Sequence, residues 1–259
     1  MHAPSAIILA AGKGTRMRSD LPKVCHEIGG RPMVCAVVDA CLAAGCERVV
    51  AVVGYKQELV RDALAAYGER VSFAVQAEQH GTGHAVRCAM PALDGTDPQT
   101  PVLVLCGDGP LIRAETLAAI LDRHNATGAS ATLATALLDD PAGYGRIKRN
   151  DLGGFLRIVE QKNADEQELA IREVNPSYYC FRLGDLTDSL AGIARNELTG
   201  EEYITDAPEL LLGQGRTVEV IDAVPPEDVL SINTPEQLAE VDRVYRSRHA
   251  TGPTQGGDD

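Results

Sequence analysis

Short apolar runs alternate with longer amphipathic segments through the first half of the chain. The apolar runs are rich in Ile, Val and Leu, and each ends close to a glycine, as is typical of strands buried on both faces. The strands predicted in this way span residues 5–10, 48–53 and 102–106. Between them, apolar side chains recur at three- and four-residue spacing, which predicts helices. These helices span residues 33–44, 57–67 and 114–125.

This alternation of strands and helices predicts an α/β fold with a doubly wound, mainly parallel, Rossmann-like sheet. Ligands of such sheets bind at the carboxyl ends of the strands. After about residue 140 the pattern changes to strands at 144–148, 155–160 and 174–182, with a DLGG turn at 151–154. We expect these strands to form an antiparallel extension across the open edge of the sheet, where a second substrate docks.

The last part of the chain predicts one more strand, one helix and a tail. The strand spans 218–222, and the helix spans 235–248 with Thr234 as its cap and Pro235 at its first position. The polar, glycine-rich residues 250–259 predict a disordered tail. We therefore expect residues 1–249 to form one domain.

The segment LAAGKGTRMRSDLPK at 9–23 carries the strongest chemical signal. A predicted buried strand ends in a loop with Gly12 and Gly14, and four cationic side chains gather within it. Glycine has no Cβ, so its backbone N–H can approach an anion closely. The cations then neutralise that anion, and the predicted ligand is a polyphosphate. The four cations are Lys13, Arg16, Arg18 and Lys23.

Two common glycine motifs and a zinc site do not fit the sequence. A dinucleotide fingerprint needs a third glycine where Met17 stands, and no Walker A string occurs. His80 and His84 are four residues apart, but no acidic residue follows His80. Glycines at 81 and 83 are expected to break a helix there, and a catalytic zinc site needs three protein ligands.

The composition limits the possible partners. A formal charge of −13 argues against a nucleic-acid surface or an anionic membrane surface as the general partner. No apolar stretch approaches membrane-spanning length, and no secretory signal precedes the first strand. The seven cysteines form no CxxC pair and mostly lie in apolar runs, as reduced cysteines do. We expect a cytoplasmic protein.

The motif LAAGKGTRM…LPK resembles the signature of sugar-1-phosphate nucleotidyltransferases. Related nucleotidyltransferases of other pathways share the motif, so it alone indicates only the superfamily. Further strings narrow the resemblance to N-acetylglucosamine-1-phosphate uridylyltransferases, and they occur in that family's order. They are QAEQHGTGHA at 76–85, GDGPL at 107–111, GYGRI at 143–147, VEQK at 159–162, EVN at 173–175, EEYITD at 201–206 and SIN at 231–233.

The resemblance implies a reaction of UTP with N-acetyl-α-D-glucosamine 1-phosphate to give UDP-N-acetylglucosamine and pyrophosphate. The attacking phosphate is already an anion, so the protein has to align and neutralise charge rather than supply a base. The implied catalytic residues are Arg16, Lys23 and Asp108. The implied ligands of Mg²⁺ are Asp108, which directly follows a predicted strand, and Asn233, which supplies an amide oxygen.

The other implied residues fall into two groups. Those that bind the nucleotide are Leu9, Ala10, Ala11, Gly12, Lys13, Gly14, Gln76, Gly81 and Thr82. Gln76 can offer a donor and an acceptor to a uracil edge. Those that bind the sugar are Gly145, Glu160, Asn175 and Asn233.

The chain departs from the resembled family in three ways. Pro176 and Ser177 replace Thr-Gly after Asn175, and Cys106 stands where an aromatic residue is common. No hexapeptide repeats of an acetyltransferase β-helix follow. We therefore expect no acetyl transfer and a monomer or weak dimer. The terminal helix should pack back on the domain through Leu238, Val241, Val244 and Tyr245.

Two other functions stay open on the sequence. One keeps the chemistry and changes the sugar or the base. The other is a non-catalytic sensor of nucleotide sugars.

Overall fold

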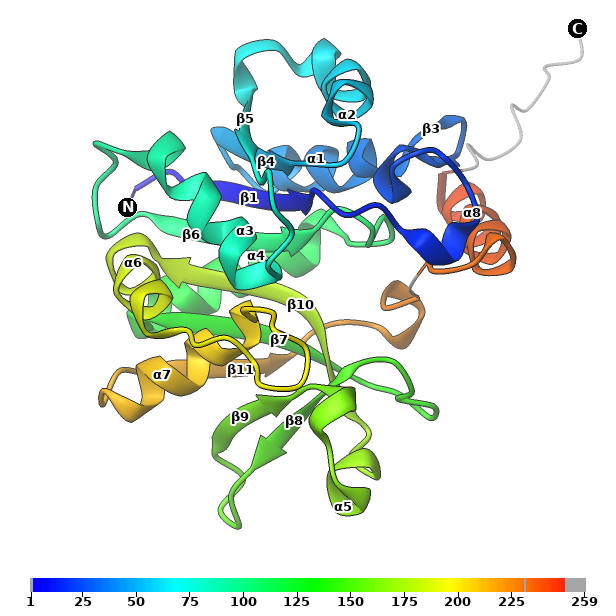
Figure 1. The fold of residues 1–259 in the computed structure, drawn as a ribbon. Coiled ribbons are helices and arrows are strands. Elements are labelled where there is room, and N and C mark those ends of the chain that lie inside the picture. Colours follow the sequence, from blue (N-terminus) through cyan, green and yellow to red (C-terminus); the bar gives the residue numbers. More distant parts are fainter. Residues whose placement is uncertain (1, 231, 250–259) are drawn as a thin grey trace, which may run out of the picture.

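The computed structural model describes residues 2–230 and 232–249, and Figure 1 shows its fold. The tail predicted at 250–259 lies outside the described residues. Seven strands form the main path of the central sheet, in the order β11-β7-β10-β6-β1-β4-β5. They are β1 (Ser5–Ala10), β4 (Arg48–Val53), β5 (Val71–Val75), β6 (Pro101–Cys106), β7 (Ala131–Leu137), β10 (Glu173–Arg182) and β11 (Val218–Asp222).

The sheet is mainly parallel, as predicted. β1 pairs in parallel with β4 and β6, and Ile7 stands opposite Val50 and Val104 in the register. Only β10 runs against its neighbours on this path, antiparallel to both β6 and β7. The expected position of this strand at an open edge was therefore wrong, because β10 lies inside the sheet. The hairpin of β8 (Gly145–Arg149) and β9 (Phe155–Val159) pairs with the start of β10 at Val174 and Asn175.

Helices cover both faces of the sheet (Figure 1). Successive residues of β1 point to opposite faces, so Ile8 packs in one hydrophobic cluster and Ile7 in the other. The cluster of Ile8 contains α1 (Met33–Ala43), α2 (Gln57–Leu64), α4 (Ala114–Thr127) and α8 (Pro235–His249). The cluster of Ile7 contains α3 (Thr82–Ala89), α6 (Leu183–Gly192) and α7 (Ala207–Gly213).

Short elements complete the described chain. They are strands β2 (Glu27–Ile28) and β3 (Arg31–Pro32), helix α5 (Glu166–Leu169), and 3₁₀ turns at Thr15–Met17, Lys23–Cys25, Ala65–Arg70, Met90–Leu93, Gln161–Asn163, Ile204–Asp206 and Pro226–Asp228. No helix in the described ranges has the length and apolar character needed to cross a lipid bilayer.

Two helices near the predicted site differ from expectation. The helix predicted at 57–67 ends at Leu64 and continues as a 3₁₀ turn. The expectation that glycines at 81 and 83 break a helix was right for Gly81, which precedes the first residue of α3, and wrong for Gly83, which lies in the first turn of that helix. Gly81 precedes that turn with a φ of 101°, where a residue without Cβ is favoured.

The terminal helix α8 packs back on the domain, which confirms the prediction. Val241 is buried, and the other three predicted side chains are partly buried against the same cluster. These are Leu238, Val244 and Tyr245.

Candidate active site

Three adjoining cavities lie beyond the carboxyl ends of β1 and β6, and Lys23 lines all of them. The glutamine cavity, of about 270 Å³, contains Gln76 and Gly12. The hairpin cavity, of about 300 Å³, contains Glu160 and Asn175 beside the β8–β9 hairpin. The loop cavity, of about 250 Å³, lies over the glycine loop. Every site residue predicted from the sequence lines at least one of the three.

The loop that follows β1 contains two glycines, Gly12 and Gly14, which differ in backbone conformation and in surroundings. Gly14 has a φ of 69°, and a Cβ there would come within 2.6 Å of the Lys23 Cβ. The fold itself therefore requires Gly14. At Gly12, nothing lies within 4 Å of the position that a Cβ would take, and the φ is not left-handed. Protein packing does not require a glycine at this second position, so the open space beside it is available to a ligand.

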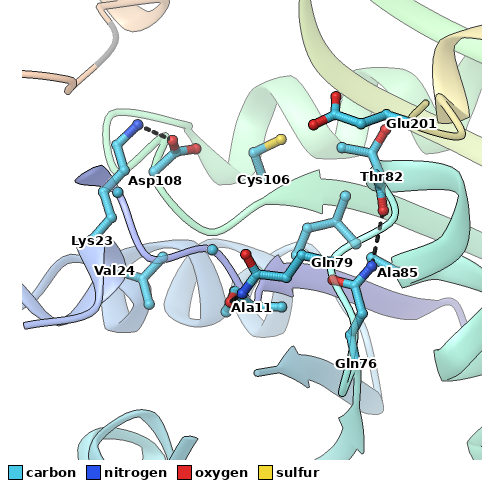
Figure 2. A pocket seen from close by; sticks show the side chains of 15 residues that line it. Ala11, Lys23, Val24, Gln76, Gln79, Thr82, Ala85, Cys106, Asp108 and Glu201 are labelled. Carbon is cyan, nitrogen blue, oxygen red and sulfur yellow. Dashed lines mark hydrogen bonds and ion pairs between the residues drawn. The ribbon is translucent and has the colours of Figure 1, made fainter. Parts of the chain in front are cut away.

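The side chains of Lys23, Asp108 and Asn233 meet where the cavities join. The Lys23 Nζ lies 2.5 Å from Asp108 Oδ2 and donates to Asn233 Oδ1 at 3.1 Å. Figure 2 shows Lys23 and Asp108 facing each other at the rim of the glutamine cavity. A carboxylate oxygen and an amide oxygen thus converge on one cation. This donor set fits Mg²⁺, which takes one or two protein oxygens and completes its shell with water and phosphate.

Two further cations border these cavities. Arg16 lies in the turn after the loop and lines the hairpin and loop cavities. Among residues 2–230 and 232–249, no carboxylate forms a salt bridge with it. Lys13 lines the loop cavity, and its ammonium lies 5.2 Å from the centre of the Tyr55 ring. In a chain of net charge −13, these two cations, which have no acidic partner in the described part of the chain, favour an anionic ligand.

Gln76 rises from the end of β5 into the glutamine cavity (Figure 2). Its Nε2 donates to the Gly81 carbonyl oxygen at 3.0 Å and lies 3.0 Å from the His84 Nδ1. An amide NH₂ has two hydrogens, and these contacts use both. In this conformation Gln76 therefore offers a ligand only an acceptor, not the donor and acceptor that we expected, because among the described residues its oxygen alone has no hydrogen-bond partner.

A comparison with known protein families shows which family the chain belongs to. Residues 6–162 match the family model of the MobA-like NTP transferase domain. The chain belongs to this family. The match covers the glycine loop, Lys23, Gln76 and Asp108, so the polyphosphate site predicted from the sequence lies in the NTP transferase core.

Curated relatives of this NTP transferase extend the likeness to nearly the whole chain. The bifunctional protein GlmU of Geobacter metallireducens is 47% identical over 244 residues, which is 94% of this chain and 51% of that protein. Those of Geobacillus sp. and Pelobacter propionicus are 46% and 44% identical over 94% and 96% of this chain. The chain spans about half the length of the curated relatives it matches.

The NTP transferase carries a partly buried carboxylate, that of Glu160, in its hairpin cavity. Glu160 follows β9, and its Oε1 accepts a hydrogen bond from the Thr205 hydroxyl at 2.9 Å. Burial raises the pKa of Glu160, and the Thr205 hydrogen bond opposes that rise. The carboxylate is thus held in place by one donor and retains acceptor capacity toward the cavity.

The segment after Asn175 is held by its own contacts. The Asn175 Nδ2 donates to the Tyr179 hydroxyl at 2.5 Å, and its Oδ1 accepts from the Ser177 N–H at 3.1 Å. Ser177 has a φ of 66°, so this serine occupies the left-handed conformation that a glycine takes more readily. Although Pro176 and Ser177 differ from the residues of the resembled family, the chain still makes a tight turn here. Both ends of the Asn175 amide are used in hydrogen bonds within this segment.

Several cavity residues were not predicted from the sequence. The Gln79 Nε2 donates to the Ala11 carbonyl at 2.8 Å, and Gln79 lines both the glutamine and loop cavities. Glu201 reaches the glutamine cavity because the Glu202 backbone pairs with residues 80 and 83. Both lie inside strings that carry the family resemblance, which was the available signal. Cys106 is also there, and burial raises the pKa of its thiol to about 12.

Proposed function

We propose that this chain transfers a uridylyl group from UTP to N-acetyl-α-D-glucosamine 1-phosphate and releases pyrophosphate. The observation that carries the proposal is the position of Lys23, whose side chain lines all three cavities. A single cation at this junction can contact both the triphosphate and the attacking sugar phosphate. Membership in the NTP transferase family and the likeness to GlmU proteins support the same chemistry.

The three cavities divide the substrates. The glutamine cavity takes the base, the ribose and the α-phosphate, the loop cavity takes the β- and γ-phosphates, and the hairpin cavity takes the sugar. The backbone N–H groups from Leu9 to Gly14 approach the phosphates, with the space beside Gly12 left open for them. Arg16 and Lys13 neutralise the triphosphate, and Arg16 supplies a planar fork suited to phosphate oxygens.

Catalysis then consists of alignment and charge neutralisation. An oxygen of the sugar phosphate attacks the α-phosphorus, and the bond to the pyrophosphate leaving group breaks on the opposite side. Lys23 and Arg16 stabilise the negative charge that develops on the transferred group. Asp108 and Asn233 would hold Mg²⁺, which supplies further neutralisation of the triphosphate. Glu160 accepts hydrogen bonds from sugar hydroxyls.

The proposal extends to the behaviour of the chain in solution. We propose that residues 1–249 act as one domain that works in the cytoplasm as a monomer or weak dimer. Its partners are then small molecules only.

Pyrophosphate release across a panel of substrates tests the proposal. The panel combines UTP, CTP, ATP and GTP with N-acetylglucosamine, glucosamine and glucose 1-phosphates, each with Mg²⁺ and with excess EDTA. We expect the highest kcat/KM for UTP with the N-acetylated sugar, and no turnover in EDTA. A better rate with another sugar would support the second candidate function, which is the same transfer to a different sugar 1-phosphate. The replacement of Thr-Gly by Pro176 and Ser177 beside the hairpin cavity favours that candidate. No release with any pair would leave only a nucleotide-sugar sensor.

A further inference from the structure

We propose that His84 is a positioning residue for base selection. Its ring holds the Gln76 carboxamide with the amide oxygen turned toward the glutamine cavity, and this arrangement favours uracil over cytosine. The inference rests on the proposed function in one respect, that the glutamine cavity receives the base of a pyrimidine nucleotide.

The orientation of the Gln76 amide follows from its partners. The Gly81 carbonyl can only accept a hydrogen bond, so the end of the Gln76 amide 3.0 Å from it is the nitrogen. The His84 Nδ1 lies 3.0 Å from the same nitrogen. Since Nε2 can only donate, Nδ1 accepts, and the proton of the neutral His84 ring is on its Nε2.

The side-chain oxygen of Gln76 is available to accept a hydrogen bond from a ligand. Gln76 is only 4% exposed, and the cavity is where that small surface lies. In the part of the chain that the structure describes, no hydrogen bond to its Oε1 occurs. The side chain therefore presents a single acceptor to the base, held by two bonds on its nitrogen.

A fixed acceptor distinguishes the two pyrimidines. Uracil carries a hydrogen on N3 and can donate it to the Gln76 oxygen. Cytosine has a lone pair on N3, so two acceptors would face each other and both would stay unpaired in a buried site. Unpaired buried polar groups are the main means by which a site rejects a near-isosteric ligand.

His84 is itself well held for this task. It lies in α3, one turn before Cys88, whose Sγ is 3.9 Å from the His84 Nε2. The His80 ring meets the His84 ring edge-on, with centroids 5.1 Å apart. Without the His84 ring, only Gly81 would hold the amide, and one hydrogen of the Gln76 NH₂ would lose its partner. The amide could then turn its nitrogen to the cavity, where the N3 of cytosine accepts.

The test compares kcat/KM for UTP and for CTP in the full chain and three variants. We expect His84→Ala to lower the UTP-to-CTP ratio about tenfold, the worth of one hydrogen bond. His84→Asn should stay within about threefold of the parent ratio, because its amide oxygen restores an acceptor for Gln76. His80→Ala is the matched control, because it removes the edge-on contact to the His84 ring but no hydrogen bond of Gln76, so the ratio should change by less than about threefold. An unchanged ratio in His84→Ala, or an equal fall in His80→Ala, would overturn the inference.

A second measurement does not depend on turnover. In the free protein, hydrogen exchange of the Gln76 side-chain amide is followed by NMR, with Gln76→Met identifying the resonances. We expect one of the two hydrogens to exchange at least about tenfold faster in His84→Ala. If the parent releases no pyrophosphate but this change occurs, the proposed function fails while the role of His84 in holding Gln76 stands. If exchange does not change, that role is wrong.

Discussion

The Lys23 ammonium lies 2.5 Å from Asp108 Oδ2 and 3.1 Å from Asn233 Oδ1, at the junction of the three cavities. The two oxygens expected to bind a metal thus hold a cation that the protein itself provides. A divalent ion at this position would compete with Lys23 for Asp108, and the lysine would then be released toward the phosphates. Asp108 is therefore the residue on which Lys23 and the proposed Mg²⁺ would both depend.

Replacing Asp108 should abolish turnover and leave the fold intact. Asp108→Ala removes the only carboxylate of the pair, so we expect kcat/KM to fall by at least about a hundredfold. Asp108→Asn is the control, because it keeps an oxygen but loses the charge, and it should be nearly as impaired. Steady-state pyrophosphate release over a range of Mg²⁺ concentrations measures both variants. A rate within a few-fold of the parent in Asp108→Ala would remove Asp108 from the proposed mechanism.

Arg16 and Arg18 form a matched pair within one turn of chain. Arg16 lines two cavities, whereas Arg18 lines none of the three. We expect Arg16→Ala to lower kcat/KM about a hundredfold or more, since a charge-assisted phosphate contact in a shielded site supplies about 3 kcal/mol of transition-state stabilisation. Arg18→Ala should stay within about twofold. Equal effects of the two substitutions would indicate a general effect of charge on nucleotide binding rather than a contact by Arg16.

Local patterns predicted several strands of the parallel part of the sheet, but β5 and β7, which pair in parallel with β4 and β11, were not predicted from the sequence. β1, β4 and β11 begin and end where the pattern predicted, and each follows a proline or a polar residue that marks its start, namely Pro4, Glu47 and Thr217. β10 also occurs close to its predicted range. Its place between β6 and β7 was not predictable, because a buried strand has the same local pattern whichever neighbours it pairs with.

The sequence predicted residues that line the site, but not which contacts they make with one another. Motif strings identified residues such as Lys23 and Asn233, which are 210 positions apart and share a hydrogen bond. No spacing rule connects such positions. The orientation of Gln76 depends on Gly81 and His84, which belong to the next element, so only the folded chain shows which end of the amide is free.

The two glycines of the loop should respond to alanine in opposite ways. Gly12→Ala should keep the parent stability, because nothing lies within 4 Å of its Cβ position, but should raise the KM for UTP about tenfold or more. Gly14→Ala should lose about 1–3 kcal/mol of stability, because its φ of 69° is left-handed and its Cβ would meet Lys23.

Urea unfolding and UTP kinetics on both loop variants check this contrast. Gly95→Ala is the control, because it has a φ of 77° with open space around it and lies in none of the three cavities. It should lose some stability and keep its kinetics. If Gly12→Ala binds UTP as the parent does, the space beside Gly12 is not a phosphate site.

The pair of Glu160 and Thr205 should control the acid limb of activity toward the sugar phosphate. Burial raises the pKa of Glu160, and the Thr205 hydroxyl, which donates to it at 2.9 Å, lowers that pKa. The ionised form accepts sugar hydroxyls, so kcat/KM should fall as the pH drops through this pKa. Thr205→Val removes the opposing hydrogen bond, the pKa rises further, and the acid limb should move to higher pH.

A pH profile of kcat/KM for the sugar phosphate, with UTP saturating, measures this shift. Glu160→Gln should lower kcat/KM about tenfold to a hundredfold at neutral pH, the worth of a hydrogen bond to a charged acceptor, and should lose the Glu160 limb. Asp206, whose pKa burial raises to about 6, still titrates in that variant, and its pKa should fall somewhat because the charge of Glu160 contributes to the rise. Thr187→Val is the control, since the Thr187 hydroxyl donates to the Leu183 carbonyl in α6, away from the cavities. An acid limb that stays in place in Thr205→Val would show that another group titrates, and Glu160 would then lose its proposed role as the acceptor of sugar hydroxyls.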